Sequence, residues 1–265
     1  MSHAQHQDIR IGTLASLSSG AGYLRQILPH GFESFQLTAW QYLGDVRLPE
    51  LAAQVRDTLG DQAIISSLAI FGNPLQDEQT ARDWETLIKS ARLFGCDLVC
   101  GFAGALEDRS VPESIPRFKE VFGPLAAVAA GEGVRIAFEN CDMGGTWEQP
   151  RWNIAHAPRA WEMLFDAVPG DTLGLEWEPC HQMVSLIDPI PQLRQWVSKV
   201  YHVHGKDATV AWDVIRREGI RSGKPVVWHR TPGFGDTSWT DIFSILRMAG
   251  FRGAIDIEGW HDPVY

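Results

Sequence analysis

The chain has 265 residues, of which 45% are apolar and 21% charged, and its formal charge is −10. This composition is ordinary for a folded globular domain and excludes a disordered chain. The acidic charge repels phosphate backbones and anionic lipid surfaces, and no basic cluster offsets it, so we expect neither a nucleic acid nor a membrane as partner.

In chain order, the polar start MSHAQHQ predicts a disordered tail over residues 1–7. Eight β-like runs follow, at residues 9–14, 33–40, 63–72, 96–104, 134–140, 171–179, 199–207 and 253–260. Amphipathic segments separate them, at residues 20–28, 49–60, 77–94, 113–131, 157–167, 188–198 and 239–250. No apolar run reaches the ~18–20 residues that a membrane-spanning helix needs.

Several amphipathic segments begin with helix-start signals. Pro49 and Pro158 suit the first turn of a helix, and Ser238 followed by Asp241 is typical of an N-cap. Eight strands that alternate with helices predict an α/β protein, a single-domain (β/α)8 TIM barrel that spans the whole chain. A doubly wound open sheet is the structural alternative, but residues 15–22 do not match the Gly-rich turn that such sheets carry after their first strand.

One flank of the predicted barrel is irregular. The sequence stops at Tyr265, just after the eighth strand, so we expect no eighth helix. An N-terminal segment, a second copy of the chain in a homo-oligomer, or a different subunit would then cover that flank.

Cysteine usage indicates the cellular compartment. Cys96, Cys100, Cys141 and Cys180 lie in or beside apolar runs, without a CxxC pair. Together with the absence of a signal-peptide pattern in the first residues, this is typical of a reduced, cytoplasmic protein.

In the last four predicted strands, apolar and ionisable residues alternate. Side chains alternate across a strand, so one face is apolar and the other carries charge. In a barrel the apolar face meets the helices, which leaves the ionisable face inside. That face carries Glu139 in the fifth strand, Glu176 and Glu178 in the sixth, His202 and His204 in the seventh, and Asp256 and Glu258 in the eighth. Burying unpaired carboxylates costs several kcal/mol each, so a cation must lie among them.

The last ionisable residues of these strands are Glu139, Glu178, His204 and Glu258. Active sites of such barrels form at the carboxyl ends of the strands. Three carboxylates and one imidazole suit one divalent metal, Mn²⁺ in the first place, with Mg²⁺, Co²⁺ or Zn²⁺ as alternatives. The competing interpretation is a set of antiparallel strands whose polar faces meet solvent, which the helices between successive strands argue against.

The motifs IAFEN, EPCH, VYHVHGKD, GFGDTSW and IDIEGW, spread from about residue 130 to the end, resemble those of the sugar phosphate isomerase/epimerase family, the xylose-isomerase-like barrels. The resemblance implies a single divalent-metal site, with Glu139, Glu178, His204 and Glu258 at the ligand positions. It also implies that His181 hydrogen-bonds substrate oxygens.

One position departs from the family pattern. The usual ligand on the sixth strand is Asp in a D-x-x-H pattern, whereas this chain has Glu178 followed by His181. The extra methylene changes how far the carboxylate reaches. Glu176, on the same face of the strand, is the alternative ligand.

A metal at this place predicts a mechanism. It would hold adjacent carbonyl and hydroxyl oxygens of a sugar and stabilise an enediolate. Glu139 and Glu258 come from strands far apart around the ring, so one can remove a proton and the other return it on the opposite face. The alternative is that both glutamates are metal ligands alone. We therefore expect an isomerase or epimerase of a keto-sugar or related polyol, an enzyme of carbohydrate metabolism.

Other residues are candidates for substrate contact. Lys206 could hydrogen-bond a hydroxyl group or pair with a carboxylate. Trp40 and Trp260 end strands at the mouth of the barrel, where aromatic faces suit sugar C–H surfaces, although Trp is most often a core residue. The GFG segment at 233–235 could bind phosphate ahead of the last helix or form a tight turn.

Three other functions compete with this one. A metal-dependent lyase that deglycosylates 3-keto-glycosides, with a partner subunit, would use the same metal and base and then expel an aglycone. A non-catalytic sugar-binding subunit would lack a ligand, whereas all four positions are filled. An apurinic endonuclease on this fold uses three zinc ions and further histidines, but the second and third strands end in LTAW and IFGN, which carry no such ligands.

Overall fold

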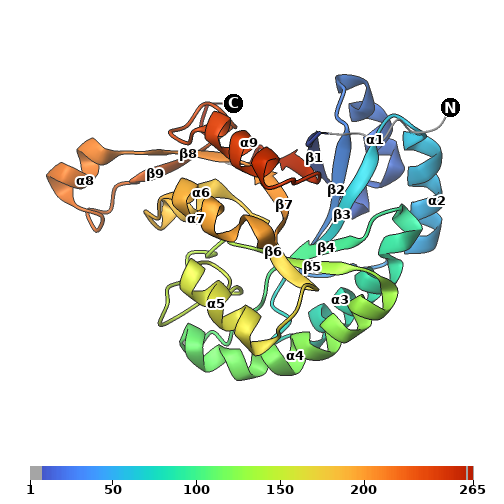
Figure 1. Ribbon diagram of the computed structural model, residues 1–265, viewed down its shortest axis with the longest axis horizontal. Helices are drawn as coiled ribbons and strands as arrows, with labels where there is room; N and C mark the ends of the chain where they lie inside the picture. Colours follow the sequence, from blue (N-terminus) through green and yellow to red (C-terminus); the bar gives the residue numbers. More distant parts are fainter. Residues whose placement is uncertain (1–7, 261, 265) are drawn as a thin grey trace.

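The computed structural model describes residues 8–260 and 262–264. Eight parallel strands close into a barrel that helices surround (Figure 1). The strands are β1 (Arg10–Ser16), β2 (Ser34–Trp40), β3 (Ile64–Phe71), β4 (Leu98–Gly101), β5 (Arg135–Glu139), β6 (Leu173–Trp177), β7 (Val200–Gly205) and β10 (Ala254–Ile257). The predicted (β/α)8 barrel is confirmed, and each predicted strand overlaps one of these. The tail predicted over residues 1–7 lies outside the described part of the chain.

The helices follow the strands in the expected alternation. They are α1 (Gly20–Ile27), α2 (Leu48–Leu59), α3 (Glu78–Ser90), α4 (Val111–Glu132), α5 (Pro158–Ala167), α6 (Pro179–Val184), α7 (Pro189–Trp196) and α9 (Trp239–Met248). The Ser238 side chain caps α9 by accepting a hydrogen bond from the Asp241 backbone N–H at 3.3 Å, as the sequence predicts. Within the described residues, no helix combines the length and apolar character that a bilayer crossing requires.

The barrel closes through its first and last strands. β1 pairs in parallel with both β2 and β10, and the Thr13 hydroxyl donates to the Ile257 carbonyl at 2.9 Å. In the described residues beyond β10, through residue 264, no helix follows. On that side, Asp8 forms an ion pair with Arg247 of α9 at 2.5 Å. Cover of this flank by another chain stays a prediction.

Apolar side chains fill the layer between strands and helices. An aromatic group from α3, α4 and β5 lies at its centre: the ring centroid of Phe122 is 5.4 Å from that of Trp84 and 4.8 Å from that of Phe138. Trp161 and Trp177 are also fully buried. Part of the high tryptophan content therefore serves the core.

The inside of the barrel is polar. Side chains of five strand residues that point inward are at most 1% exposed: Gln36, Glu176, His202, His204 and Asp256. The alternation of apolar and ionisable residues along the last strands therefore does separate an outer apolar layer from a charged interior.

An arm, residues 207–230, projects from the barrel between β7 and α9 (Figure 1). It consists of β8 (Asp207–Val210), α8 (Trp212–Glu218) and β9 (Val227–Arg230), with β8 and β9 paired antiparallel. Both of its strands contact α6 at the base of the arm. The sequence predicts a single strand over 199–207 and no element between it and the helix over 239–250, so the arm is a correction to that prediction.

Candidate active site

Four ionisable side chains meet at the carboxyl end of the barrel. Glu139 is the last residue of β5, Glu178 follows β6, His204 lies near the end of β7 and Glu258 follows β10. One ligand atom from each lies within 4.8 Å of the others, and all four side chains are buried. The structure thus brings together the four residues that the strand ends predict.

The three carboxylates surround one nitrogen of His204. Its Nδ1 atom is 3.2 Å from Glu139 Oε1, 3.4 Å from Glu258 Oε2 and 3.5 Å from Glu178 Oε2. A ring nitrogen carries at most one hydrogen, so it cannot satisfy three carboxylates at once. Both oxygens of Glu178 and Oε2 of Glu258 are buried without accepting a hydrogen bond. The cluster therefore fits a divalent cation, which would engage these oxygens together with the imidazole nitrogen.

Electrostatics support the same conclusion. Burial raises the pKa of Glu139 above its usual value and the pKa of Glu178 well above it, and neighbouring carboxylates add to both effects. Burial also raises the pKa of Glu258, but His204 and Lys206 outweigh it and hold that pKa well below normal. Two of the three carboxyl groups thus resist ionisation in this pocket unless further positive charge is supplied.

His181 and Lys206, the polar candidates for substrate contact, border the cluster. Lys206 Nζ lies 2.8 Å from Glu258 Oε1 and 3.7 Å from Glu178 Oε1, and the side chain is 2% exposed. His181 Nε2 lies 3.3 Å from Glu178 Oε1. Burial and the charge of Lys206 hold the pKa of His181 well below normal, so its imidazole is neutral and can both donate and accept a hydrogen bond.

A cavity of ≈ 380 Å³ opens above the cluster. Glu139, His204 and Glu258 line it, together with His181 and Lys206. Trp40 and Trp260 line its rim and are 58% and 55% exposed. The cavity is large enough for a monosaccharide and offers polar groups at its floor and aromatic faces at its mouth.

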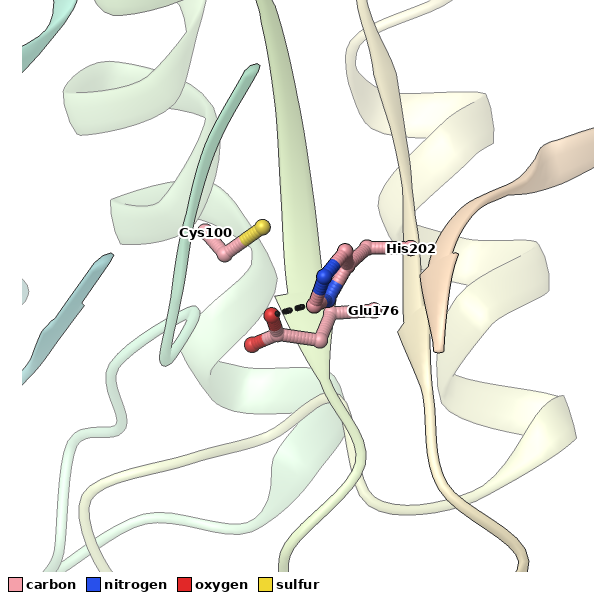
Figure 2. A group of neighbouring side chains, drawn as sticks. All are labelled: Cys100, Glu176 and His202. Carbon is pink, nitrogen blue, oxygen red and sulfur yellow. Dashed lines mark hydrogen bonds and ion pairs between the residues drawn. The ribbon is translucent and has the colours of Figure 1, made fainter. Parts of the chain in front are cut away.

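Glu176, the alternative ligand on β6, lies on the other side of the His204 ring. Its Oε1 atom is 3.1 Å from His204 Nε2 and 2.9 Å from His202 Nδ1. Figure 2 shows Glu176 grouped with His202 and Cys100. The structure therefore places Glu178, and not Glu176, among the four.

Two amide side chains that support the site, one of an asparagine and one of a glutamine, were not identified from the sequence. Asn140 follows Glu139, and its side chain exchanges hydrogen bonds with the backbone N–H and carbonyl of Glu178, at 2.7 and 2.9 Å. Gln36 on β2 accepts a hydrogen bond from His204 Nε2 at 2.8 Å. The alternation of Ser34, Gln36 and Thr38 along a strand was the signal that could have revealed this inward face.

The GFG segment does not offer its backbone to a phosphate. The N–H groups of Gly233 and Gly235 donate to Asp207 Oδ2 at 3.1 and 3.2 Å, and Thr237 N–H donates to Asp207 Oδ1 at 3.1 Å. The indole N–H of Trp239 also donates to Asp207, at 2.9 Å. A buried side chain of the protein thus takes the place that an anion would need, which leaves the tight turn as the structural role.

Comparisons with known proteins agree with this architecture. The family described as Xylose isomerase-like TIM barrel matches residues 24–264. The chain is 23% identical over 231 residues to an inosose isomerase of Halalkalibacterium halodurans, which covers 85% of this chain and 76% of that relative. It is 27% identical over 154 residues to the uncharacterized protein YfiH of Bacillus subtilis (strain 168), which covers 55% of this chain but only 45% of YfiH.

Among solved structures, a xylose isomerase domain protein from Planctomyces limnophilus has a TM-score of 0.73 at 18% identity, covering 95% of this chain and 91% of that one. At this level of identity the likeness shows the fold. The match with YfiH spans less than half the length of that relative.

Proposed function

The chain belongs to the xylose isomerase-like TIM-barrel family, and from this premise we propose that it is a divalent-metal-dependent isomerase or epimerase of a keto-sugar or related polyol. The observation that carries the proposal is the buried cluster of Glu139, Glu178, His204 and Glu258 at the floor of the cavity. A divalent cation held there would polarise a substrate carbonyl and stabilise the charge of an enediolate. Mn²⁺ suits this mostly oxygen donor set best.

Glu139 and Glu258 are the proposed acid–base pair. They belong to β5 and β10, which β6 and β7 separate in the barrel, so they can approach a substrate carbon from different sides. Without a bound ion, His204 and Lys206 hold the pKa of Glu258 well below normal despite its burial, while burial raises the pKa of Glu139, so Glu258 is the carboxyl group held ionised. The proposed pairing itself rests on the positions of the two groups on different sides of the site. Such a pair contributes about 10²–10⁴-fold to the rate.

The residues around the cavity supply the proposed substrate contacts. His181 and Lys206 would hydrogen-bond the sugar hydroxyl groups next to the reacting carbon. Trp40 and Trp260 would cover the C–H faces of the ring at the rim. Because these contacts need no phosphate group, we propose a neutral sugar or polyol as the substrate.

Elemental analysis of protein purified without a chelator tests the metal site. We expect about one divalent ion per chain in the wild type, and its loss in Glu139→Gln and in His204→Ala. The matched control is Glu162→Gln, which changes an exposed carboxylate on α5 and should keep the ion. A protein that takes up no metal even after incubation with Mn²⁺ would refute the proposal, and three zinc ions per chain would favour a nuclease.

Proton exchange in heavy water tests the reaction. Keto-sugars and polyols incubated with the metal-loaded enzyme should gain deuterium at the carbon next to the carbonyl, as followed by NMR. Glu258→Gln should abolish the exchange while the Glu162→Gln control retains it. No exchange with any keto-sugar by a metal-loaded protein would contradict the enediolate mechanism.

A second candidate is a lyase that acts on 3-keto-glycosides. It uses the same residues for proton removal and then expels an aglycone. The aromatic rim favours it, because Trp152 packs against Trp40 with ring centroids 5.6 Å apart and so extends the aromatic surface beyond the cavity that Trp40 lines. Release of an aglycone, measured by chromatography, distinguishes this reaction from epimerisation.

A further inference from the structure

A second buried group of charged residues lies one layer deeper in the barrel than the metal cluster. His202 lies between two carboxylates: Nδ1 is 2.9 Å from Glu176 Oε1 and Nε2 is 2.9 Å from Asp256 Oδ2. All three side chains are at most 1% exposed. Both ring nitrogens of His202 are thus engaged by carboxylate oxygens, and the ring is fixed between Glu176 and Asp256.

This group is connected to His204 through Gln36. The Gln36 side-chain amide donates to Ser67 Oγ at 2.8 Å and to Glu176 Oε1. Its Oε1 atom then faces His204 Nε2 at 2.8 Å. The opposite orientation of the amide would place Gln36 Oε1 against Glu176 Oε1, two acceptors in contact, so Glu176 fixes which end of the amide meets His204.

The orientation of Gln36 determines the tautomer of His204. An acceptor at Nε2 requires the ring hydrogen on that nitrogen, and the Glu176 carboxylate, 3.1 Å from Nε2, favours the same arrangement. The lone pair is then on Nδ1, the atom that faces Glu139, Glu178 and Glu258.

We propose that Gln36 and Glu176 are positioning residues that prepare His204 as an Nδ1 metal ligand, and that His202, itself held by Asp256, keeps Glu176 in place. The chain of hydrogen bonds runs from Asp256 through His202, Glu176 and Gln36 to His204. This inference rests on the proposed metal site. Partners of this kind typically contribute 10–100-fold to metal affinity.

The same group has a competing interpretation, a second metal ion. Figure 2 shows Cys100, Glu176 and His202 close together. They offer ligand atoms within 4.8 Å of one another, and Glu176 Oε2 accepts no hydrogen bond. An ion there would need a free nitrogen on His202, and both are engaged by carboxylates. It would also break the contact that orients Gln36. The positioning role therefore predicts one ion per chain and not two.

Metal affinity in two variants tests the proposal. Gln36→Leu removes the acceptor at Nε2, and Glu176→Gln removes the charge that orients Gln36; each should weaken Zn²⁺ binding 10–100-fold in a chelator competition, with one ion still bound at saturation. The matched control is Thr38→Val on the same face of β2, whose hydroxyl donates to the Ala15 carbonyl and not to His204. It should bind within twofold of wild type.

The tautomer of His204 provides a readout that a merely structural role would not change. In ¹⁵N-histidine-labelled, Zn²⁺-loaded wild type, long-range ¹H–¹⁵N NMR should show the hydrogen of His204 on Nε2 and none on Nδ1. In Gln36→Leu the Nε2–H signal should broaden through exchange. The spectrum of the wild type tests ligation through Nδ1, and the two independent variants, Gln36→Leu and Glu176→Gln, test the positioning role, so the test survives if one of them does not fold.

The outcomes are separable. A wild type with the hydrogen on Nδ1 or with two bound ions, or folded variants that bind Zn²⁺ as tightly as wild type, would overturn the positioning role and leave the proposed function intact. A wild type that binds no divalent ion would overturn both.

Discussion

Lys206 shows how a buried charge can serve two states of the site. Burial by itself lowers the pKa of Lys206, but the charges of Glu178 and Glu258 outweigh it and hold the pKa above its usual value. The ammonium group therefore stays charged and neutralises part of the carboxylate cluster when no metal is bound. When a metal is present, the same group is available at the cavity for a substrate oxygen.

Replacing Lys206 should destabilise the metal-free protein. Lys206→Met leaves two buried carboxylates without their cation, and breaking a buried pair in this way costs about 3–5 kcal/mol in the free energy of unfolding. Saturating Mn²⁺ should restore part of the loss. Urea denaturation with and without metal measures both effects, with Lys89→Met as control, because the exposed Lys89–Glu85 ion pair contributes little to stability. Equal losses in the two variants would contradict the assigned role of Lys206.

Metal affinity should increase with pH. Burial lowers the pKa of His204, but Glu176 and Glu139 outweigh it and raise it well above 6.5, so the metal-free ring is protonated near neutral pH. A metal must displace that proton, and each proton released makes the apparent affinity about tenfold tighter per pH unit. Calorimetric titration between pH 6 and 8, in buffers of different ionisation enthalpy, measures the slope and the proton count. A metal affinity that does not change with pH would contradict the predicted release of a proton from His204.

The stability of the metal-free protein should show the opposite trend. The folded-state pKa of His204 lies above the unfolded value near 6.5. Its contribution to stability is therefore complete below pH 6.5 and is lost as the pH rises through the folded pKa. Urea midpoints of metal-free wild type should fall as the pH is raised above neutral, and His204→Ala should flatten this dependence. A urea midpoint that rises over the same pH range would show that a group other than His204 determines the pH dependence of stability.

At the scale of elements, strands were easier to predict than the arm. Each barrel strand has the apolar alternation or apolar run that period-based analysis detects. The arm strands, DATV and VWHR, have four residues each, which is too few to show an alternation of apolar and polar residues. Both strands also contact α6, a tertiary contact that the sequence pattern does not reveal. The strand ends at residues 139, 178, 204 and 258 could be found from parity alone. Parity could not choose between Glu176 and Glu178, because the two share a face and differ only in depth.

Asp207 joins the arm to the loop before α9. It lies at the start of β8, is fully buried, and accepts hydrogen bonds from Gly233, Gly235, Thr237 and Trp239. Because the next strand of the barrel begins only after α9, this one carboxylate fixes where the chain leaves the arm and returns to the barrel.

Removing that carboxylate should loosen the loop. Asp207→Ala leaves several backbone N–H groups without an acceptor, which we expect to lower the free energy of unfolding by about 3 kcal/mol. Limited proteolysis should then cut within residues 231–238 faster than in the wild type. The control is Asp236→Ala, which removes the acceptor of a single exposed hydrogen bond donated by the Val210 backbone N–H. We expect this variant to lower the free energy of unfolding by less than about 1 kcal/mol. Equal proteolysis of both variants would contradict the anchoring role.

For the whole molecule, the polar interior of the barrel affects both the stability of the fold and the chemistry of the site. A polar interior of carboxylates and imidazoles is costly in a fold that most often fills its centre with branched apolar side chains. Here Gln36, Ser67, His202 and Lys206 satisfy part of it through hydrogen bonds and ion pairs. Three buried carboxylate oxygens without a partner, both of Glu178 and Oε2 of Glu258, lie at the four-residue cluster, and Glu176 Oε2 lies one layer deeper. Occupation of the four-residue cluster should therefore stabilise the entire domain.

Metal binding should raise the melting temperature. Free Mn²⁺ at 100 times its Kd adds ~2.7 kcal/mol to the free energy of unfolding. For a domain of this size that corresponds to about 5–11 °C. Differential scanning calorimetry with Mn²⁺ and with a chelator measures the shift. His204→Ala should show no shift, and an equal shift in that variant would place the ion elsewhere.

The order in which the strands are synthesised determines when the four-residue cluster can be completed. The last strand to be made, β10, pairs with the first, and Glu258 directly follows it. Ribosomes add roughly 5–20 residues per second, so roughly 12–50 s separate the synthesis of β1 from the appearance of Glu258. Only at the end of that interval, once His204 has been made, does the nascent chain carry the other three residues of the cluster, still without the strand that completes the ring. The complete four-residue cluster therefore forms only when β10 closes the barrel.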